Sequence, residues 1–433
     1  MNFAFLFQGC DFYTERFSRY GYIYKTHLFG SRTIRVIGPD NVKKILLGEP
    51  HHVTTTWPKS VRILLGDGAL SNKYGETHRV QKRILQQALD HRAIANFVPE
   101  IQNVVQECLH EWCDEEGELL GYPCCRDLAF RLAGKVIFGM DFEEAEREKL
   151  TTVFKTVVDN MFSLPINCPG FGFHQGLKSR KLIQNQIKEL LQTSDKRTTS
   201  AAVSVLDVLR NFLDDNTLTE DVIIDECVEL LFAGHHSTAS SSCSLLLQLF
   251  KNPDICEKIR SELNMNEVDE QSKNDLTYDV INNLDYLENV IKEILRMFPP
   301  VGGGFRKAKR TFGIGGYEVP QDWTIVYSIR ETHKSSPLFP DNDNFRPERW
   351  DEPEIDIQGL RFNYLPFGAG TRSCPGEKFA KLSLKVFVIE LIRGCKWDIK
   401  NPNPNLTLLP APKPVDLLPI SFSRRRSFPL SLV

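Results

Sequence analysis

Apolar residues recur at helical spacing over most of the chain. Intervals of three and four residues predict several helices between residues 76 and 162, a further helix that ends near Leu191, and another from Leu284 to Phe298. Polar or helix-breaking residues interrupt the first of these regions at Asp90 and at residues 116–123. The pattern therefore predicts a mainly α-helical protein.

The longest predicted helix lies between residues 217 and 250. Its start, Thr217-Leu-Thr-Glu220, has the spacing of a capping box, and Asn252-Pro253 ends the apolar run. Roughly 30 residues that rise about 1.5 Å each would cross a whole domain. Polar residues between Ala233 and Thr238 interrupt the apolar pattern of this helix.

Short alternating segments predict small sheets beside the helices. Residues 22–29 and 33–37 favour two strands, a helix is expected from Pro39 to Leu47, and residues 305–330 favour strands with glycine turns. Residues 50–75 lack a clear period and are expected to form a long loop with partial helix, a kind of loop that is usually functional. We expect one domain over residues 1–433.

The composition excludes several classes of protein. With 433 residues, 41% of them hydrophobic, the chain can bury a large core, and its net charge of -3 gives no nucleic-acid footprint. Eleven cysteines without a CxxC pair indicate a reducing, cytosol-facing setting. No apolar run approaches the ~20 residues of a membrane span. The polar stretch 193–199 and the Arg424–Arg426 tail are expected to be solvated.

A single cysteine, Cys374, stands between a glycine-rich loop and the first turn of an apolar helix expected over residues 377–391. Unpaired amides and the positive end of the helix dipole favour a thiolate there. Such a sulfur is either a metal ligand or a nucleophile.

The residues around this sulfur favour the metal ligand. Gly368 and its neighbouring glycines let the backbone approach a flat ligand closely, and Phe367 can cover the loop from water. Arg372 offers a fork of donors to a carboxylate such as a haem propionate. Together these residues fit haem b, an iron protoporphyrin held by one axial thiolate.

This loop resembles the haem loop of the cytochrome P450 monooxygenases, which reads Phe-x-x-Gly-x-Arg-x-Cys-x-Gly. The fixed positions are filled by Phe367, Gly370, Arg372, Cys374 and Gly376. The alternative is a buried structural cysteine near a helix cap. The resemblance implies the mainly α cytochrome P450 fold with small β-sheets and a long central helix over the haem. It also implies O₂-dependent hydroxylation with NADPH electrons delivered by a reductase partner.

Glu293 and Arg296 are three residues apart and can pair on one helix face. Alone, such a pair is usually a surface contact. The resemblance implies that Arg349, in the Pro-Glu-Arg-Trp segment, joins them in a buried network beneath the haem that holds the cysteine loop.

The resemblance also implies cations for the haem propionates. Arg372 and Arg306 match family positions that reach a propionate. Where the family usually has Trp-x-x-x-Arg, this chain has His78-x-x-x-Lys82, so these two residues are carried over as haem-binding residues. Each of them could instead be an ordinary surface residue.

In the long helix the family places an acid and an alcohol that deliver protons to iron-bound dioxygen. Here the acid position is His236 and the alcohol position is Ser237, followed by Thr238, which is a departure at the acid. We take all three as catalytic. The alternative is that these polar residues only kink the helix.

Several stretches resemble the retinoic acid hydroxylase group, over about residues 20–419. The stretches are Tyr22–Gly30, Trp57–Arg62, Phe162–Ile166, Gly303–Arg306 and Pro414–Asp416. The resemblance implies retinoic acid as substrate, in retinoid metabolism. The implied substrate pocket is aromatic, with one arginine that holds the carboxylate or lies at the surface, and its residues are Trp57, Arg62, Phe162, Phe232 and Phe305.

Two other functions are compatible with these residues, a haem-thiolate hydroperoxide isomerase and a non-catalytic retinoid-binding haem protein. The resemblance implies a monomer on the cytosolic face of the endoplasmic reticulum membrane. The N-terminal anchor usual in eukaryotic members is absent, so the chain is expected to be truncated, an incomplete gene model, or a soluble member that at most associates with a membrane surface.

Overall fold

Helices form most of the structure, which is a computed structural model that describes residues 9–140, 142–193, 202–268, 276–353, 355 and 357–425. Most of the polar stretch 193–199 and Arg426 lie outside these residues. The α-helices are α2 (Gly9–Tyr20), α3 (Pro39–Leu47), α4 (Lys59–Leu65), α5 (Gly75–Ala88), α6 (His91–Asn96), α7 (Val98–Asp114), α8 (Gly121–Ala133), α9 (Glu144–Asp159), α10 (Gly172–Thr193), α11 (Val205–Asp214), α12 (Glu220–Lys251), α13 (Pro253–Met265), α14 (Tyr278–Asn282), α15 (Asp285–Met297), α16 (Arg330–Ser335), α17 (Ile357–Asn363) and α18 (Glu377–Gly394). The expected mainly α fold is confirmed.

Small sheets stand at the edges of the helical body. The largest has the order β1-β2-β8-β5-β3, in which only β2 and β8 run parallel among the described strands. Its strands are β1 (Ile23–Leu28), β2 (Ser31–Val36), β3 (Val53–Thr55), β5 (Gly303–Ala308) and β8 (Thr324–Ser328). The others are β4 (Leu119–Leu120), β9 (Cys395–Ile399) and β12 (Pro419–Arg424) in one sheet, β6 (Phe312–Ile314) with β7 (Tyr317–Val319), and β10 (Leu406–Thr407) with β11 (Lys413–Pro414).

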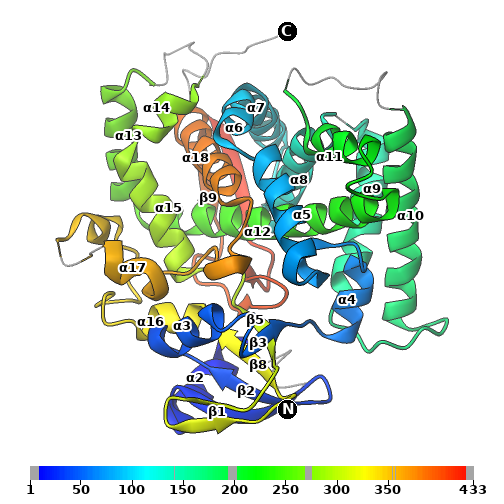
Figure 1. Ribbon diagram of the computed structural model, residues 1–433. Coiled ribbons are helices and arrows are strands. Elements are labelled where there is room, and N and C mark those ends of the chain that lie inside the picture. Colours follow the sequence, from blue (N-terminus) through cyan, green and yellow to red (C-terminus); the bar gives the residue numbers. More distant parts are fainter. Residues whose placement is uncertain are drawn as a thin grey trace.

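Helix α12 crosses the centre of the molecule, with α8 and α18 packed against it (Figure 1). Its length agrees with the prediction, but the predicted cap is wrong by two positions. The cap is Thr219, whose hydroxyl accepts from the Val222 N–H at 3.4 Å. Thr217 lies in the preceding turn, where its N–H donates to the Asp215 carboxylate at 2.9 Å. Thr217 therefore belongs to a local Asx turn and does not cap α12.

The described residues form three hydrophobic core clusters. The largest extends from Val61 in α4 to Phe422 in β12 and fills the space between the helices. The second packs the five-stranded sheet against α3, with Val36 and Ile45 fully buried. The third is small and packs Phe12 of α2 against Leu28 and Val326 of the sheet. The sheet lies at the lower end of the view in Figure 1, apart from most of the helices. In the described part of the chain, the helices all fall short of the length and apolarity that a membrane span requires.

Candidate functional site

The cysteine loop is a tight turn that leads into α18. Its Cys374 N–H donates to the Phe367 carbonyl at 2.9 Å, which closes the loop on itself. Gly368 and Gly370 have φ values of 70° and 74°, in the left-handed region that favours glycine. A Cβ on Gly370 would stand 3.0 Å from the Leu46 carbonyl, so glycine lets the loop lie directly on the end of α3.

Two opposing effects act on the Cys374 thiol. Burial of the loop raises its pKa, whereas the Gly376 N–H and the charge of Lys82 act to lower it. Lys82 is held close because its Nζ donates to the Thr371 carbonyl at 2.8 Å and to the Ser373 hydroxyl at 3.0 Å. Cys374 nevertheless keeps an exposed side that a ligand can reach. A metal cation would replace the proton and overcome the effect of burial.

Arg372 of the cysteine loop and Arg306 of β5 both contact the Glu49 carboxylate. This carboxylate accepts from Arg372 Nε at 3.0 Å and lies 3.6 Å from Arg306 Nε. Arg372 also donates to the carbonyls of Leu70 at 3.4 Å and Lys73 at 2.7 Å. The loop that carries Arg372 is thereby joined to the segment after α3 and to the end of the loop before α5.

Arg372, Lys82 and Arg306 carry positive charges near His78, and the Glu49 carboxylate pairs with the two arginines. His78 is buried, and its pKa is lowered to about 4 by burial and by the charges of Arg372, Lys82 and Arg306. At neutral pH it is therefore an uncharged hydrogen-bonding group. Arg306 Nε is buried without a hydrogen bond to any described residue. This excess of positive charge near the cysteine fits the two propionates of haem, which Arg372 and Arg306 would hold while Cys374 would bind the iron.

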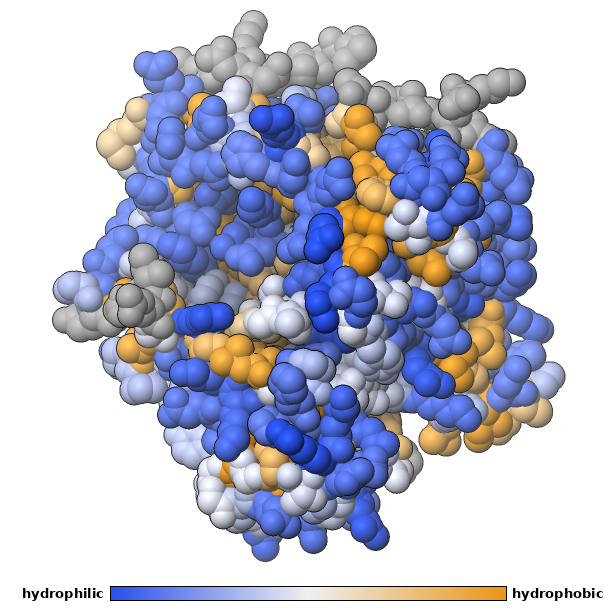
Figure 2. All heavy atoms as spheres, in the orientation of Figure 1, coloured by the Kyte–Doolittle hydropathy of each residue, from blue (hydrophilic) through white to orange (hydrophobic). Residues whose placement is uncertain are grey.

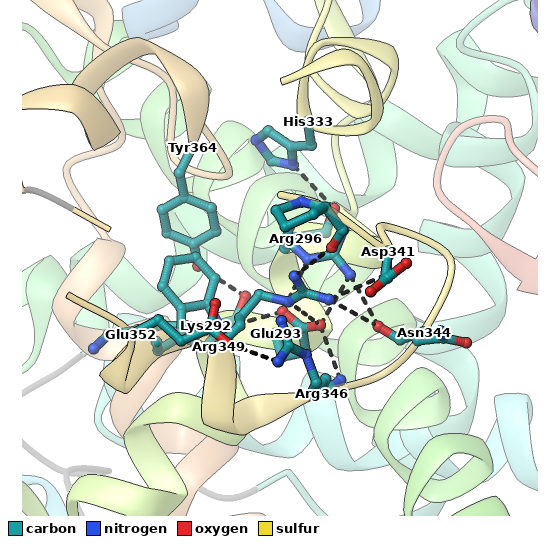
Figure 3. A network of polar contacts seen from close by, with 12 residues as sticks. Lys292, Glu293, Arg296, His333, Asp341, Asn344, Arg346, Arg349, Glu352 and Tyr364 are labelled. Carbon is teal, nitrogen blue, oxygen red and sulfur yellow. Dashed lines mark hydrogen bonds and ion pairs between the residues drawn. The ribbon is translucent and has the colours of Figure 1, made fainter. Parts of the chain in front are cut away.

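A buried ionic network surrounds Glu293 of α15 (Figure 3). Glu293 accepts from Arg296 Nε at 2.8 Å and from Arg349 Nε at 2.9 Å, and all three side chains are at most 1% exposed. Glu293 also accepts from the Arg346 N–H at 3.0 Å and the Trp350 indole at 3.1 Å. These charges are paired and hydrogen-bonded, as burial requires. The structure thus brings together the three residues expected in this network.

His333 in α16 joins that network to the cysteine loop. Its Nδ1 lies 3.0 Å from the Arg296 carbonyl, and its Nε2 accepts from the Leu365 N–H at 2.7 Å. Because Nε2 is an acceptor, the proton must be on Nδ1, and burial lowers the pKa of His333 to about 4 so that the ring stays neutral. The sequence held no signal for this role, since the histidine stands in a short polar helix.

The polar segment of α12 presents its residues to different neighbours. Ser237 donates to the Ala233 carbonyl at 2.6 Å, and Ala233 is exposed in the middle of an otherwise buried helix. Thr238 is buried. His236 Nδ1 lies 3.3 Å from the Tyr122 hydroxyl of α8, and burial together with the charge of Lys413 lowers the pKa of His236 to about 4.

A cavity of about 320 Å³ gathers most of the expected substrate residues. Trp57, Arg62 and Phe305 line it, together with Phe29, which the sequence reasoning did not select. The rings of Trp57 and Phe305 are 5.9 Å apart. Aromatic rings therefore line part of the cavity, and the Arg62 guanidinium and Lys59 are the cations at its wall.

The remaining two aromatic residues occupy different places. Phe162 stacks on Phe29 with ring centroids 5.8 Å apart, which puts it beside the cavity wall. Phe232 is on α12 and contacts His236, with ring centroids 6.3 Å apart, and does not line this cavity. Trp57, Phe305 and Phe162 thus belong to one aromatic group beside Arg62, and Phe232 lies next to the polar segment of α12.

Comparisons with known proteins agree with this geometry. The family model Cytochrome P450 matches residues 8–418. The chain is 40% identical to cytochrome P450 26A1 of Xenopus laevis over 94% of this chain and 84% of that protein. It is 36% identical to human cytochrome P450 26B1, over 96% and 83% of the two chains. A cyanobacterial CYP120A1 structure with bound retinoic acid superposes with a TM-score of 0.88 and 32% identity, over 98% and 96% of the two chains.

The matched region contains the cysteine loop, the cationic cluster, the Glu293 network and the continuous central helix α12 with its polar segment. The family match and the relatives confirm the expected haem cofactor, and the Cys374 loop with its cationic cluster fits that group. The chain belongs to the cytochrome P450 family and is a haem-thiolate monooxygenase.

Proposed function

We propose that this chain hydroxylates retinoic acid, or a similar long apolar carboxylic acid, with electrons from an NADPH-dependent reductase. The observation that carries the proposal is the aromatic cavity with Arg62 at its wall. A long apolar chain would lie against the rings of Trp57, Phe29 and Phe305, and the exposed guanidinium would bind the carboxylate.

The retinoic acid in the similar CYP120A1 structure supports this substrate class, because that chain shares 32% of its residues over nearly the whole length. Haem, when bound by Cys374, supplies the activation of dioxygen. The residues of this chain then bind and orient the substrate, exclude water with their aromatic rings, and move protons. The Trp57 indole N–H, which is buried and has no hydrogen-bond partner among the described residues, adds a donor for the ligand.

Substitution of Arg62 tests the substrate. Arg62→Ala is expected to weaken all-trans retinoic acid about tenfold or more and to leave retinol almost unchanged, because only the acid carries the charge that the guanidinium binds. Titration of each retinoid against the haem absorption band of the purified protein measures both affinities.

Lys59 provides a matched control, because it lines the same cavity and is also exposed. Lys59→Ala should leave the acid-to-alcohol preference intact, whereas Trp57→Ala should weaken both ligands through lost apolar contact. Equal losses of the acid and the alcohol in Arg62→Ala would remove Arg62 from the site. Absence of any spectral change with retinoic acid in the unmodified protein would refute the substrate class.

We further propose that His236 takes the place of the family's acid in proton delivery. Its imidazole is neutral at working pH, and its Nε2 is buried without a hydrogen bond to a described residue, so this nitrogen can exchange a proton with water. Ser237, one residue further on, would hold that water on the open side of α12.

His236→Ala is expected to retain haem and substrate and to lower the ratio of hydroxylated product to NADPH consumed, with peroxide as the diverted product. His236→Glu should restore the ratio. Tyr122→Phe is the control, because it removes the neighbouring hydroxyl and keeps the imidazole. An unchanged ratio in His236→Ala would leave Ser237 and water as the relay. Product formed from a hydroperoxide without reductase would instead favour the isomerase.

The loop before α10 supports contact with a membrane surface, which we propose is the cytosolic face of the endoplasmic reticulum. Leu164, Ile166 and Phe171 are exposed there, to 70%, 41% and 44%. Figure 2 shows the apolar surface around this loop at the lower right of the molecule. A lipid-facing loop of this kind would accept an apolar substrate directly from the bilayer.

Flotation with phospholipid vesicles tests the contact. Leu164→Asp is expected to reduce the vesicle-bound fraction severalfold, because a charge replaces a side chain that would enter the lipid. Met265→Asp is the matched control, since Met265 is 77% exposed at the end of α13. Equal binding of the two variants would refute a role for the loop.

A further inference from the structure

Two thiols lie in contact where α7 ends and β9 begins. The Cys113 and Cys395 sulfurs are 3.4 Å apart, although the residues are 282 positions apart in the sequence. Cys113 stands in the last turn of α7, and Cys395 is the first residue of β9, directly after α18. A disulfide needs the sulfurs at about 2.05 Å, so small side-chain rotations would bring this pair to bonding distance.

The backbone on both sides of the pair is fixed. Cys395 is opposite Arg424 in the antiparallel register of β9 and β12, and Arg425 Nε donates to the Cys395 carbonyl at 3.2 Å. Arg424 donates to both carboxylate oxygens of Asp114, the neighbour of Cys113, at 2.5 Å. Helix α7 also packs against α18 and β12. The contact between the sulfurs therefore belongs to a well-connected corner of the fold and not to a loose loop.

The two thiols differ in character, as an attacking and a resolving thiol must. The hydrogen bond from Cys395 and the charge of Arg424 lower the pKa of Cys113, which is half-buried. Cys395 is buried, and its pKa is raised because it keeps the shared proton. A small oxidant can thus reach Cys113, whose pKa is lowered, while the Cys395 thiol lies in contact with it.

Other cysteines of the described chain do not combine these properties. Cys125 and Cys243 are neighbours across α8 and α12, but both are at most 1% exposed, and burial raises the pKa of Cys125 well above its ordinary value. Cys168 is exposed in the loop before α10. In the Cys113–Cys395 pair the sulfurs are in contact, Cys113 is partly exposed, and the charge of Arg424 lies nearby.

We propose that Cys113 and Cys395 form a reversible disulfide when the protein meets a peroxide, which fastens α7 to the start of β9. The Cys113 thiolate attacks one oxygen of hydrogen peroxide, the O–O bond breaks, and hydroxide leaves with a proton as water. The Cys395 sulfur then attacks the sulfenic sulfur of Cys113, the S–O bond breaks, and a second water leaves. Two thiols are oxidised by two electrons, and the peroxide is reduced to two waters.

Peptide mapping of the haem-loaded full chain tests this modification. The protein is treated with a small molar excess of hydrogen peroxide, its remaining thiols are alkylated, and it is digested without reductant. Mass spectrometry should find the Cys113 and Cys395 peptides joined with the loss of two hydrogens, and dithiothreitol should separate them. The treated protein should also melt several degrees higher, because the bond restricts the unfolded chain.

Serine variants and the chain without substitutions together test whether the disulfide forms. In Cys395→Ser the cross-link and the gain in melting temperature should both disappear, whereas Cys168→Ser should retain both. Cys113 that remains alkylatable, or that becomes a sulfinic acid without cross-linking, would overturn the proposal. Peptide mapping of the peroxide-treated protein without substitutions distinguishes these results even if a serine variant does not fold.

Discussion

Cys374→Ser is expected to abolish the long-wavelength absorption band of the reduced carbonyl complex, because that band requires a thiolate ligand to the iron. Serine is close in size to cysteine, and the main-chain hydrogen bond from residue 374 to Phe367 would remain. The cationic cluster at Arg306 and Arg372 is also untouched. The loss should therefore be specific to ligation, with the fold retained.

Difference spectra of the reduced protein with carbon monoxide measure this effect, and circular dichroism verifies the fold. Cys168→Ser is the control, because Cys168 is an exposed thiol in the loop before α10 and should not affect the band. An unchanged band in Cys374→Ser would exclude Cys374 as the ligand.

Glu293→Ala is expected to yield little haem-loaded protein. Arg296 and Arg349 are at most 1% exposed and would remain as buried charges without their carboxylate. Breaking such a pair costs about 3–5 kcal/mol, which is a large part of the roughly 5–15 kcal/mol that stabilises a folded domain. The ratio of haem absorption to protein and the melting temperature measure the loss.

Glu288 provides a matched control on the same helix, α15. Its side chain is 23% exposed and pairs with Lys385 at 3.0 Å and Lys381 at 3.7 Å. Because Glu288 is partly exposed and the buried Lys385 keeps its hydrogen bond to the Ile281 carbonyl at 3.2 Å, Glu288→Ala should cost less than Glu293→Ala. Similar haem content and melting temperature in the two variants would show that the Glu293 network does not hold the site.

The fold was predictable where local pattern and tertiary packing agree. The long apolar run of α12 and the proline start of α3 are examples, and the observed α3 has the predicted bounds, Pro39 to Leu47. Helix α11 and the late strands β9 to β12 were not predicted. Those strands are only two to six residues long, which is too short for a local period to mark them.

The site was predictable where its residues form a contiguous motif, as around Cys374. Residues recruited by tertiary contact were missed, including Glu49 beside Arg372, Tyr122 beside His236, and His333. An isolated glutamate, tyrosine or histidine carries no pattern of its own. Only the packed structure shows that their polar atoms complete the hydrogen bonds of the motif residues.

The loop around Cys374 is fixed from two sides, by His333 through Leu365 and by the Leu46–Glu49 segment against Gly370 and Arg372. None of these contacts uses a residue that lines the aromatic cavity. Substitutions in the cavity wall can therefore accumulate during evolution and change which molecules are oxidised, while the iron ligation is inherited unchanged. The separation makes a shift to a new substrate accessible in single steps, without an intermediate that has lost its haem.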